Sequence, residues 1–149
     1  MDEYEKYKAE CDKIREFNNN LLDEFKKWLK RSKLKAKTIQ RHIENVDFYI
    51  NEFLLYESAV EAKDGADGIG MFLGYWFIKK AMWSSTAQIK SNAASLKKFY
   101  TFLHEKGEID KEDLDDLKKR IKEDMPEWIA TMQRYDDPSI TDMEEVWGI

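Results

Sequence analysis

Eight lysine and arginine side chains fall between residues 26 and 43, and no aspartate or glutamate lies among them. An ordinary exposed helix face is balanced by ion pairs between neighbouring turns, and this stretch has no carboxylates to form them. Unpaired positive charge suits phosphate, and each phosphate that it neutralises releases counterions, so such binding depends on salt. A solvated lysine-rich surface is the simpler interpretation. The eight residues are Lys26, Lys27, Lys30, Arg31, Lys33, Lys35, Lys37 and Arg41.

A second stretch, residues 76–104, carries five lysines and again no carboxylate side chain. Short polar and basic groups gather where a helix is expected to begin in it, and the free N–H groups of a helix N-terminus suit phosphate. Gln88 and Asn92 carry amides of the kind that pair with adenine in the major groove. Ser85 and Gln88 have a competing role, because Ser-x-x-Gln is a capping box. The candidate contacts here are Ser84, Ser85, Gln88, Lys90 and Asn92.

Groups suited to catalysis or metal binding are few. His42 and His104 have no partner at metal-ligand spacing, so we interpret them as surface or internally hydrogen-bonded histidines. The acidic residues 108–116 lack the glycine and the ligand spacing of a calcium loop, and the helix dipole already favours acids in a first turn. With no nucleophile–base pair and no phosphate-binding glycine loop, we expect neither an enzyme nor a cofactor or metal.

The composition indicates a folded domain. The chain has 149 residues, of which 42% are hydrophobic and 13% aromatic, enough to build a core. A net charge of −5 argues against nucleic acid, but the average hides the two carboxylate-free stretches. A single cysteine, Cys11, and an N-terminus without the pattern of a signal peptide favour the cytoplasm. The longest apolar-rich run, Ile69 to Ile78, is too short to span a membrane.

The elements that must position these groups are predicted to be helices, because apolar residues recur every three or four positions. A first helix begins as early as Tyr4 and fades into a basic turn at residues 31–35, and a second ends near Tyr56. Their apolar stripes are Phe17, Leu21, Phe25, Trp28 and Leu29, then Ile39, Ile43, Val46, Ile50 and Phe53.

Two further helices follow a glycine-rich loop. Asp67 is expected to cap a third helix over Ile69–Met82, which is apolar nearly all round and therefore central. The capping box at Ser85 opens a fourth helix, which ends at Lys106-Gly107.

Residues 110–149 predict an acidic helical extension. Asp110 is expected to cap a helix that ends at Pro126, and Trp128, Ile129 and Met132 suggest one more short helix. A loosely held tail follows Asp137-Pro138, although Trp147 is a candidate to dock. The extension either covers an apolar edge of the domain, which we favour, or folds back over the basic surface. The absence of β-alternation makes the fold all-α.

The order of these landmarks resembles the SAM-like core-binding domain of tyrosine recombinases and phage integrases, over about residues 17–109. The ordered set is more specific than any one member, above all between Leu96 and Ile109. The matching residues are Leu22, Phe25, Trp28-Leu29, Thr38-Ile39, Asp67, Ile69, Phe72-Leu73, Ser84-Ser85, Leu96, Lys97, Phe99-Tyr100, Phe102-Leu103, Gly107 and Ile109.

The resemblance implies a four-helix bundle in residues 1–109 that forms half of a clamp around double-stranded DNA, with its second and fourth helices toward the duplex. These are the two places where the sequence concentrates positive charge. The DNA contacts that follow are Lys33, Lys35, Lys37, Thr38, Arg41, Ser84, Ser85, Gln88, Lys90 and Asn92.

The catalytic features of that family have no counterpart here. Its members use several arginines, a His-x-x-Arg element and a tyrosine nucleophile, whereas His42 is followed by Ile-Glu-Asn and His104 by Glu-Lys-Gly. The 40 residues after Ile109 are too few for a catalytic domain. We therefore expect a DNA-binding module without recombinase catalysis by itself, with a recombinase or another protein as a further partner.

The alternative function is a helical protein–protein interaction module that kept the scaffold and lost DNA contact. It predicts an exposed apolar patch around Trp128, Met132 and Trp147, and basic residues that are scattered in space.

Overall fold

The computed structural model describes residues 2–148, and every regular element in that range is helical. This confirms the all-α class, whereas the SAM-like four-helix arrangement stays a prediction. The α-helices are α1 (Glu3–Arg31), α2 (Ala36–Asp47), α3 (Ile69–Met71), α4 (Phe77–Lys80), α5 (Thr86–Glu105), α6 (Lys111–Asp136) and α7 (Met143–Trp147). The π-helical segments η1 (Phe48–Phe53) and η4 (Phe72–Trp76) and the 3-10 turns η2 (Ala62–Asp64) and η3 (Ala66–Gly68) complete the described elements.

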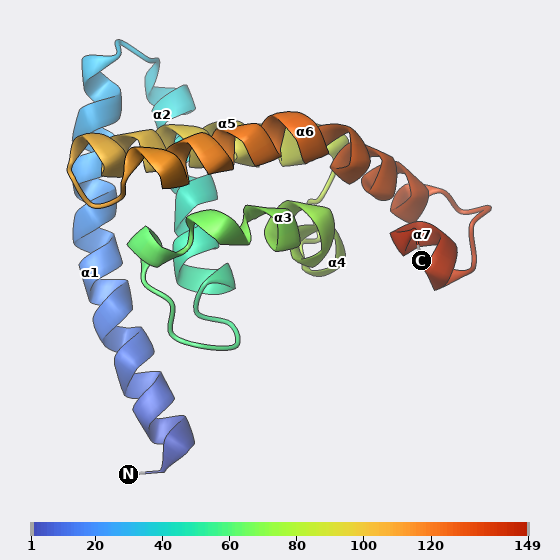
Figure 1. Ribbon diagram of the computed structural model, residues 1–149, viewed down its shortest axis with the longest axis horizontal. Coiled ribbons are helices and arrows are strands. Elements are labelled where there is room, and N and C mark those ends of the chain that lie inside the picture. Colours follow the sequence, from blue (N-terminus) through green and yellow to red (C-terminus); the bar gives the residue numbers. More distant parts are fainter. Residues whose placement is uncertain (1, 149) are drawn as a thin grey trace.

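Helix α1 is longer than the bundle on which it packs. Asp2 caps it by accepting a hydrogen bond from the Glu5 N–H, and its C-terminal half buries Phe25 and Leu29 in the core. The first turns extend beyond the other helices (Figure 1), but Cys11 and Ile14 are buried against Leu55. Phe17, predicted as a core residue, is 60% exposed because the buried face of α1 passes through its neighbour Asn18 instead, and that prediction is wrong.

The third helical segment departs most from its prediction. Asp67 does not cap it, because Asp67 lies inside η3 and no side chain caps Ile69. The segment runs as α3, η4 and α4 and ends at Lys80, which leaves Met82 in a loop and 98% exposed. The preceding loop is held by two buried phenols, since Tyr49 donates to the Gly65 carbonyl at 2.6 Å and Tyr100 to that of Ala62 at 2.8 Å.

The starts predicted for α5 and α6 are confirmed. The Ser85 and Asp110 side chains accept hydrogen bonds from the N–H groups of Gln88 and Asp113, at 3.1 and 2.8 Å. The end predicted at Pro126 is wrong, because α6 continues through it to Asp136 and includes Trp128 and Met132, which were assigned to a separate helix.

The chain after Asp137 is not the loose tail that was predicted. It forms α7, whose Val146 is 2% exposed, and Trp147 packs on the rings of Tyr75 and Tyr135.

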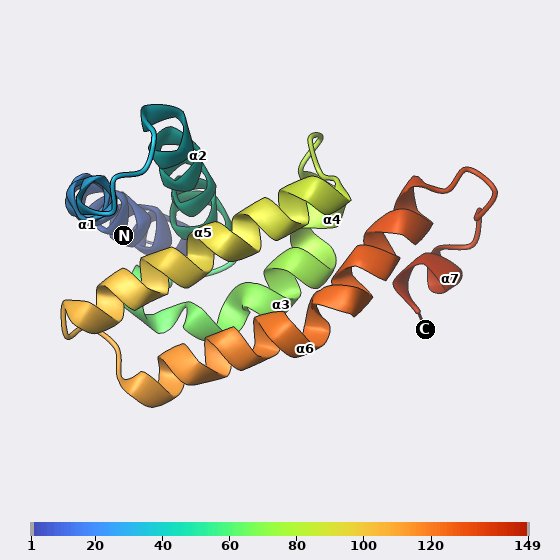
Figure 2. The same ribbon diagram turned by 90° about the horizontal axis from the view of Figure 1, so that it is seen from above.

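The helices surround one main core (Figures 1 and 2). Helices α5 and α6 run antiparallel beside each other, and α2 crosses α5 while also packing on α1. The α3–α4 segment packs against both α5 and α6, below them in Figure 1, and α7 packs at the far end of α6. Among residues 2–148, no helix combines the length and apolar character needed to cross a membrane.

Candidate nucleic-acid interface

The end of α1, the turn after it and the first half of α2 form one basic segment, residues 26–41, which we call the basic turn. All eight of its lysine and arginine side chains are exposed. None of the ion pairs formed within residues 2–148 involves any of the eight. Lys33, in the turn between the two helices, has a left-handed backbone conformation with a φ of +58°. The basic turn therefore presents cations with no carboxylate partner in the described chain.

A buried polar contact holds α2 on α5 beside this turn. His42 is 3% exposed, and its Nδ1 lies 2.7 Å from the Ser95 hydroxyl. The Asn45 amide donates to the hydroxyls of Ser91 and Ser95 at 3.1 and 3.0 Å. The contact places His42, interpreted from the sequence as a surface or internally bonded histidine, in the second of these classes.

The surroundings of His42 reveal a local positive field. Burial, and then the positive charges of Arg41 on α2 and Lys98 on α5, hold the pKa of His42 below its usual value of 6.5. Two cations from different helices therefore act on one buried imidazole. Lys98 was not among the predicted contacts, although it lies in the carboxylate-free stretch 76–104 that pointed to this helix.

Three of the five residues predicted at the start of α5 make hydrogen bonds inside the fold through their side chains. Ser85 is the helix cap, and the Ser84 hydroxyl donates to the Ile78 carbonyl at 3.1 Å. Asn92 is 1% exposed and donates to the Gln88 carbonyl at 2.8 Å, so its amide is not presented to a base in this structure. Lys90 is exposed and Gln88 is half-buried.

A groove of about 500 Å³ separates the two predicted sets of contacts. Arg41 lines one side of it and Gln88 the other, with the half-exposed ring of Trp83 between α4 and α5. Three carboxylates line it as well, namely Glu44, Asp47 and Glu52. Because these would repel phosphate, the start of α5 does not extend the surface that Lys33, Lys35, Lys37, Thr38 and Arg41 form.

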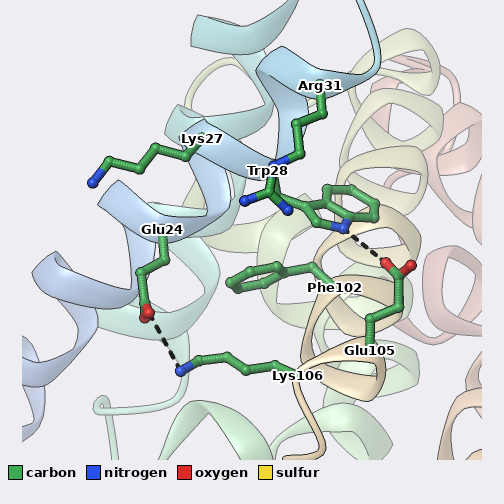
Figure 3. Close-up of a pocket in the computed structure, with 7 residues that line it drawn as sticks. All are labelled: Glu24, Lys27, Trp28, Arg31, Phe102, Glu105 and Lys106. Atoms are coloured by element: carbon green, nitrogen blue, oxygen red, sulfur yellow. Dashed lines mark hydrogen bonds and ion pairs between the residues drawn. The ribbon is translucent and has the colours of Figure 1, made fainter.

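A cleft of about 420 Å³ lies on the other side of the basic turn, between the ends of α1 and α5 (Figure 3). The Trp28 indole N–H donates to the Glu105 carboxylate at 2.7 Å, and Lys106 pairs with Glu24 at 3.4 Å. Phe102 packs against Trp28 inside the cleft. These contacts tie the end of α1 to α5, and Lys27 and Arg31, which also line the cleft, keep their charges unpaired among the described residues.

The C-terminal end of the acidic extension lies away from the basic turn (Figure 1). A pocket beside α6 is lined by Asp67, Asp113 and Asp116, and the negative charge of Asp110, above all, raises the pKa of Asp113. No group of three or more His, Cys, Asp or Glu within residues 2–148 is arranged to hold a metal ion. Helix α7 docks on α6 and Tyr75, so the acidic end does not cover the basic turn (Figure 1).

No protein-family model, no curated protein and no solved structure matches this chain. The fold and the site therefore define an all-α protein whose basic turn carries eight exposed cations without ion pairs among residues 2–148.

Proposed function

We propose that this protein is a DNA-binding module that holds duplex DNA mainly through phosphate contacts from the basic turn. The observation that carries the proposal is the exposure of all eight cations between Lys26 and Arg41 with no ion pair to any carboxylate of residues 2–148. Phosphate contacts supply most of the sequence-independent affinity of a protein for DNA.

Two features support this assignment. Arg41 and Lys98 both act on the buried His42, so a backbone phosphate at the α2–α5 crossing meets charge from two helices. The turn is also held rigidly, since α1 is tied to α5 through Trp28 and α2 through His42 and Asn45. Cations on a rigid support lose less conformational freedom when they bind. The proposal assigns no catalytic step to these residues.

The test is fluorescence anisotropy of a labelled random-sequence duplex, titrated with protein at salt concentrations from about 50 to 200 mM. Since each neutralised phosphate contributes about −0.9 to the slope of log K against log salt, contacts from at most eight cations predict a slope no steeper than about −7. Changing Lys33, Lys35, Lys37 and Arg41 to Glu is expected to abolish binding.

The matched control changes four exposed lysines outside the basic turn, Lys8, Lys13, Lys118 and Lys122, to Glu. It alters the net charge by the same amount, so it separates a local site from a general loss of positive charge. Equal loss of binding in both variants, or no binding by the wild type at the lowest salt, contradicts the proposal.

The alternative function, a protein–protein interaction module, keeps one of the three residues predicted for its apolar patch. Trp128 and Met132 are 5% and 0% exposed, whereas Trp147 is half-buried beside the exposed rings of Tyr75 and Tyr135. The basic residues, however, follow one continuous turn rather than lying scattered.

A further inference from the structure

Aromatic and methionine side chains gather on a surface far from the basic turn. Tyr56, Met71 and Tyr75 are 53%, 60% and 38% exposed, and Tyr135 on α6 is 39% exposed. Exposed apolar surface that is contiguous, rather than scattered singly, marks interaction sites in soluble proteins. We call this surface the aromatic strip; its residues are Tyr56, Met71, Tyr75, Trp76, Tyr135 and Trp147.

Ring contacts and a shared cleft connect the strip from end to end. The ring of Tyr56 lies 5.4 Å from that of Trp76, and both line one cleft of about 280 Å³ with Met71 and Tyr75. The Tyr75 ring is 4.7 Å from that of Trp147, which is 6.0 Å from Tyr135. The strip therefore continues from the end of η1 across η4 to α7 and α6.

The two ends of the strip carry opposite charges. At the α4 end, the ammonium groups of Lys79 and Lys80 lie 5.5 and 5.3 Å from the ring centroids of Tyr75 and Tyr56, against one carboxylate, Glu57. At the α7 end, three exposed carboxylates, Asp142, Glu144 and Glu145, lie within one turn of helix. Neither lysine pairs with a carboxylate of residues 2–148.

We propose that the aromatic strip binds a second copy of this chain in a two-fold dimer. A two-fold interface joins the same patch on both subunits, so the patch must be complementary to itself. A strip that is positive at one end, aromatic in the middle and negative at the other meets this requirement. Rotation by 180° places Lys79 and Lys80 of one copy on the α7 carboxylates of its partner.

The same rotation brings the aromatic centres of the two strips together. Tyr75 and Trp147 lie between the charged ends, where apolar burial and aromatic contacts supply most of the binding energy. The charged ends then fix the direction in which the copies pair.

The test is analytical ultracentrifugation of the full chain from about 1 µM to about 1 mM, with circular dichroism as a check of folding. The wild type is expected to shift from monomer to dimer over this range. Tyr75→Glu is expected to remain monomeric, because it replaces the central ring with a carboxylate that loses its hydration when the interface closes. Phe17→Glu is the control, since Phe17 is an exposed aromatic residue as well but lies on α1, outside the strip.

Charge reversal tests the orientation of the two copies. Lys79→Glu with Lys80→Glu makes both ends of the strip negative, and Glu144→Lys with Glu145→Lys makes both ends positive. Each double variant alone is expected to be monomeric, whereas their mixture forms a heterodimer. A wild type that stays monomeric at the highest concentration, double variants that dimerise alone, or a mixture that stays monomeric would each overturn the proposal.

Discussion

At the scale of single residues, His42 connects the stability of the fold to the proposed DNA contact. Its imidazole is buried between α2 and α5, and its pKa is lowered by burial and by the charges of Arg41 and Lys98. A phosphate bound by those two cations would offset their charges. Binding of DNA at the α2–α5 crossing must then raise the pKa of His42, and by linkage it must tighten as the pH falls.

The first prediction concerns the pH dependence of stability. Because the pKa of His42 is below 6.5 in the folded state, the unfolded state binds its proton first as the pH falls. The free energy of unfolding is therefore expected to be largest above pH 6.5 and to fall below it. Denaturant titrations of the wild type and of His42→Gln check this, since the variant is expected to lose that part of the slope. If the pH dependence of the free energy of unfolding is the same in His42→Gln, another group takes up the proton.

The second prediction concerns the pKa of His42 itself, measured by NMR titration of its ring with and without duplex DNA. The pKa is expected to move upward when DNA is bound, and Lys98→Gln is expected to reduce the movement. Lys90→Gln serves as the control, because Lys90 lies on the same helix but is not among the charges that act on His42. A His42 pKa that does not respond to DNA would remove Arg41 and Lys98 from the contact.

Single residues also show where sequence reasoning ends. The role of Ser85 as a cap was predictable, because capping depends on a local pattern. The burial of Asn92 was not, because it depends on which side of α5 meets α2. Phe17 fits an apolar stripe, yet the buried face of α1 passes through the polar Asn18 beside it, whose amide donates to the Asn51 side chain at 2.8 Å, and no hydrophobic pattern reveals this.

At the scale of elements, α6 shows how packing overrides a local stop signal. A proline inside a helix removes a backbone hydrogen bond and costs about 3 kcal/mol. Pro126 nevertheless lies inside α6, where Trp128, Thr131 and Met132 are buried. Trp128 packs directly over Gly74 of η4, where a Cβ atom would lie 3.0 Å from the indole Cδ1. Both residues can be read from the sequence, but only the fold shows that they are in contact.

A matched pair of glycine substitutions tests the contact between Trp128 and Gly74. Gly70→Ala places its methyl group 3.1 Å from the mobile end of Arg120, so it is expected to stabilise the protein by about 0.5–1 kcal/mol through reduced chain entropy. Gly74→Ala meets the fixed indole of Trp128 and is expected to be about 1–3 kcal/mol less stable than Gly70→Ala. Urea denaturation measures both. Equal stability of the two variants would show that α6 does not depend on the Gly74 contact.

Hydrogen exchange locates the effect of the second substitution. In Gly74→Ala, the loss of protection is expected in residues 126–148, which Trp128 anchors, while α1 and α2 stay protected. A loss of protection spread evenly over the chain would argue against a local effect of the Trp128–Gly74 contact.

At the scale of the whole molecule, the two proposed surfaces lie apart, on different elements. The basic turn is at the top of Figure 1, whereas α4 and α7 lie lower and α7 is at the far end. The net charge of −5 is thus an average over a positive turn and acidic surfaces elsewhere. The order of charge along the sequence predicted the positive turn, but the aromatic strip joins residues from four separate elements and required the fold.

The arrangement of the two surfaces leads to a prediction that rests on both proposals. A two-fold dimer through the aromatic strip holds its two basic turns apart, so one dimer should bind two duplexes at once. The measurement is capture of a labelled duplex on beads that carry a second, unlabelled duplex. Wild-type protein is expected to bridge them, and Tyr75→Glu is expected to bind a single duplex in solution without bridging. Loss of both activities in Tyr75→Glu would mean that DNA contact itself needs the dimer, and bridging that survives the substitution would mean that the copies meet through another surface.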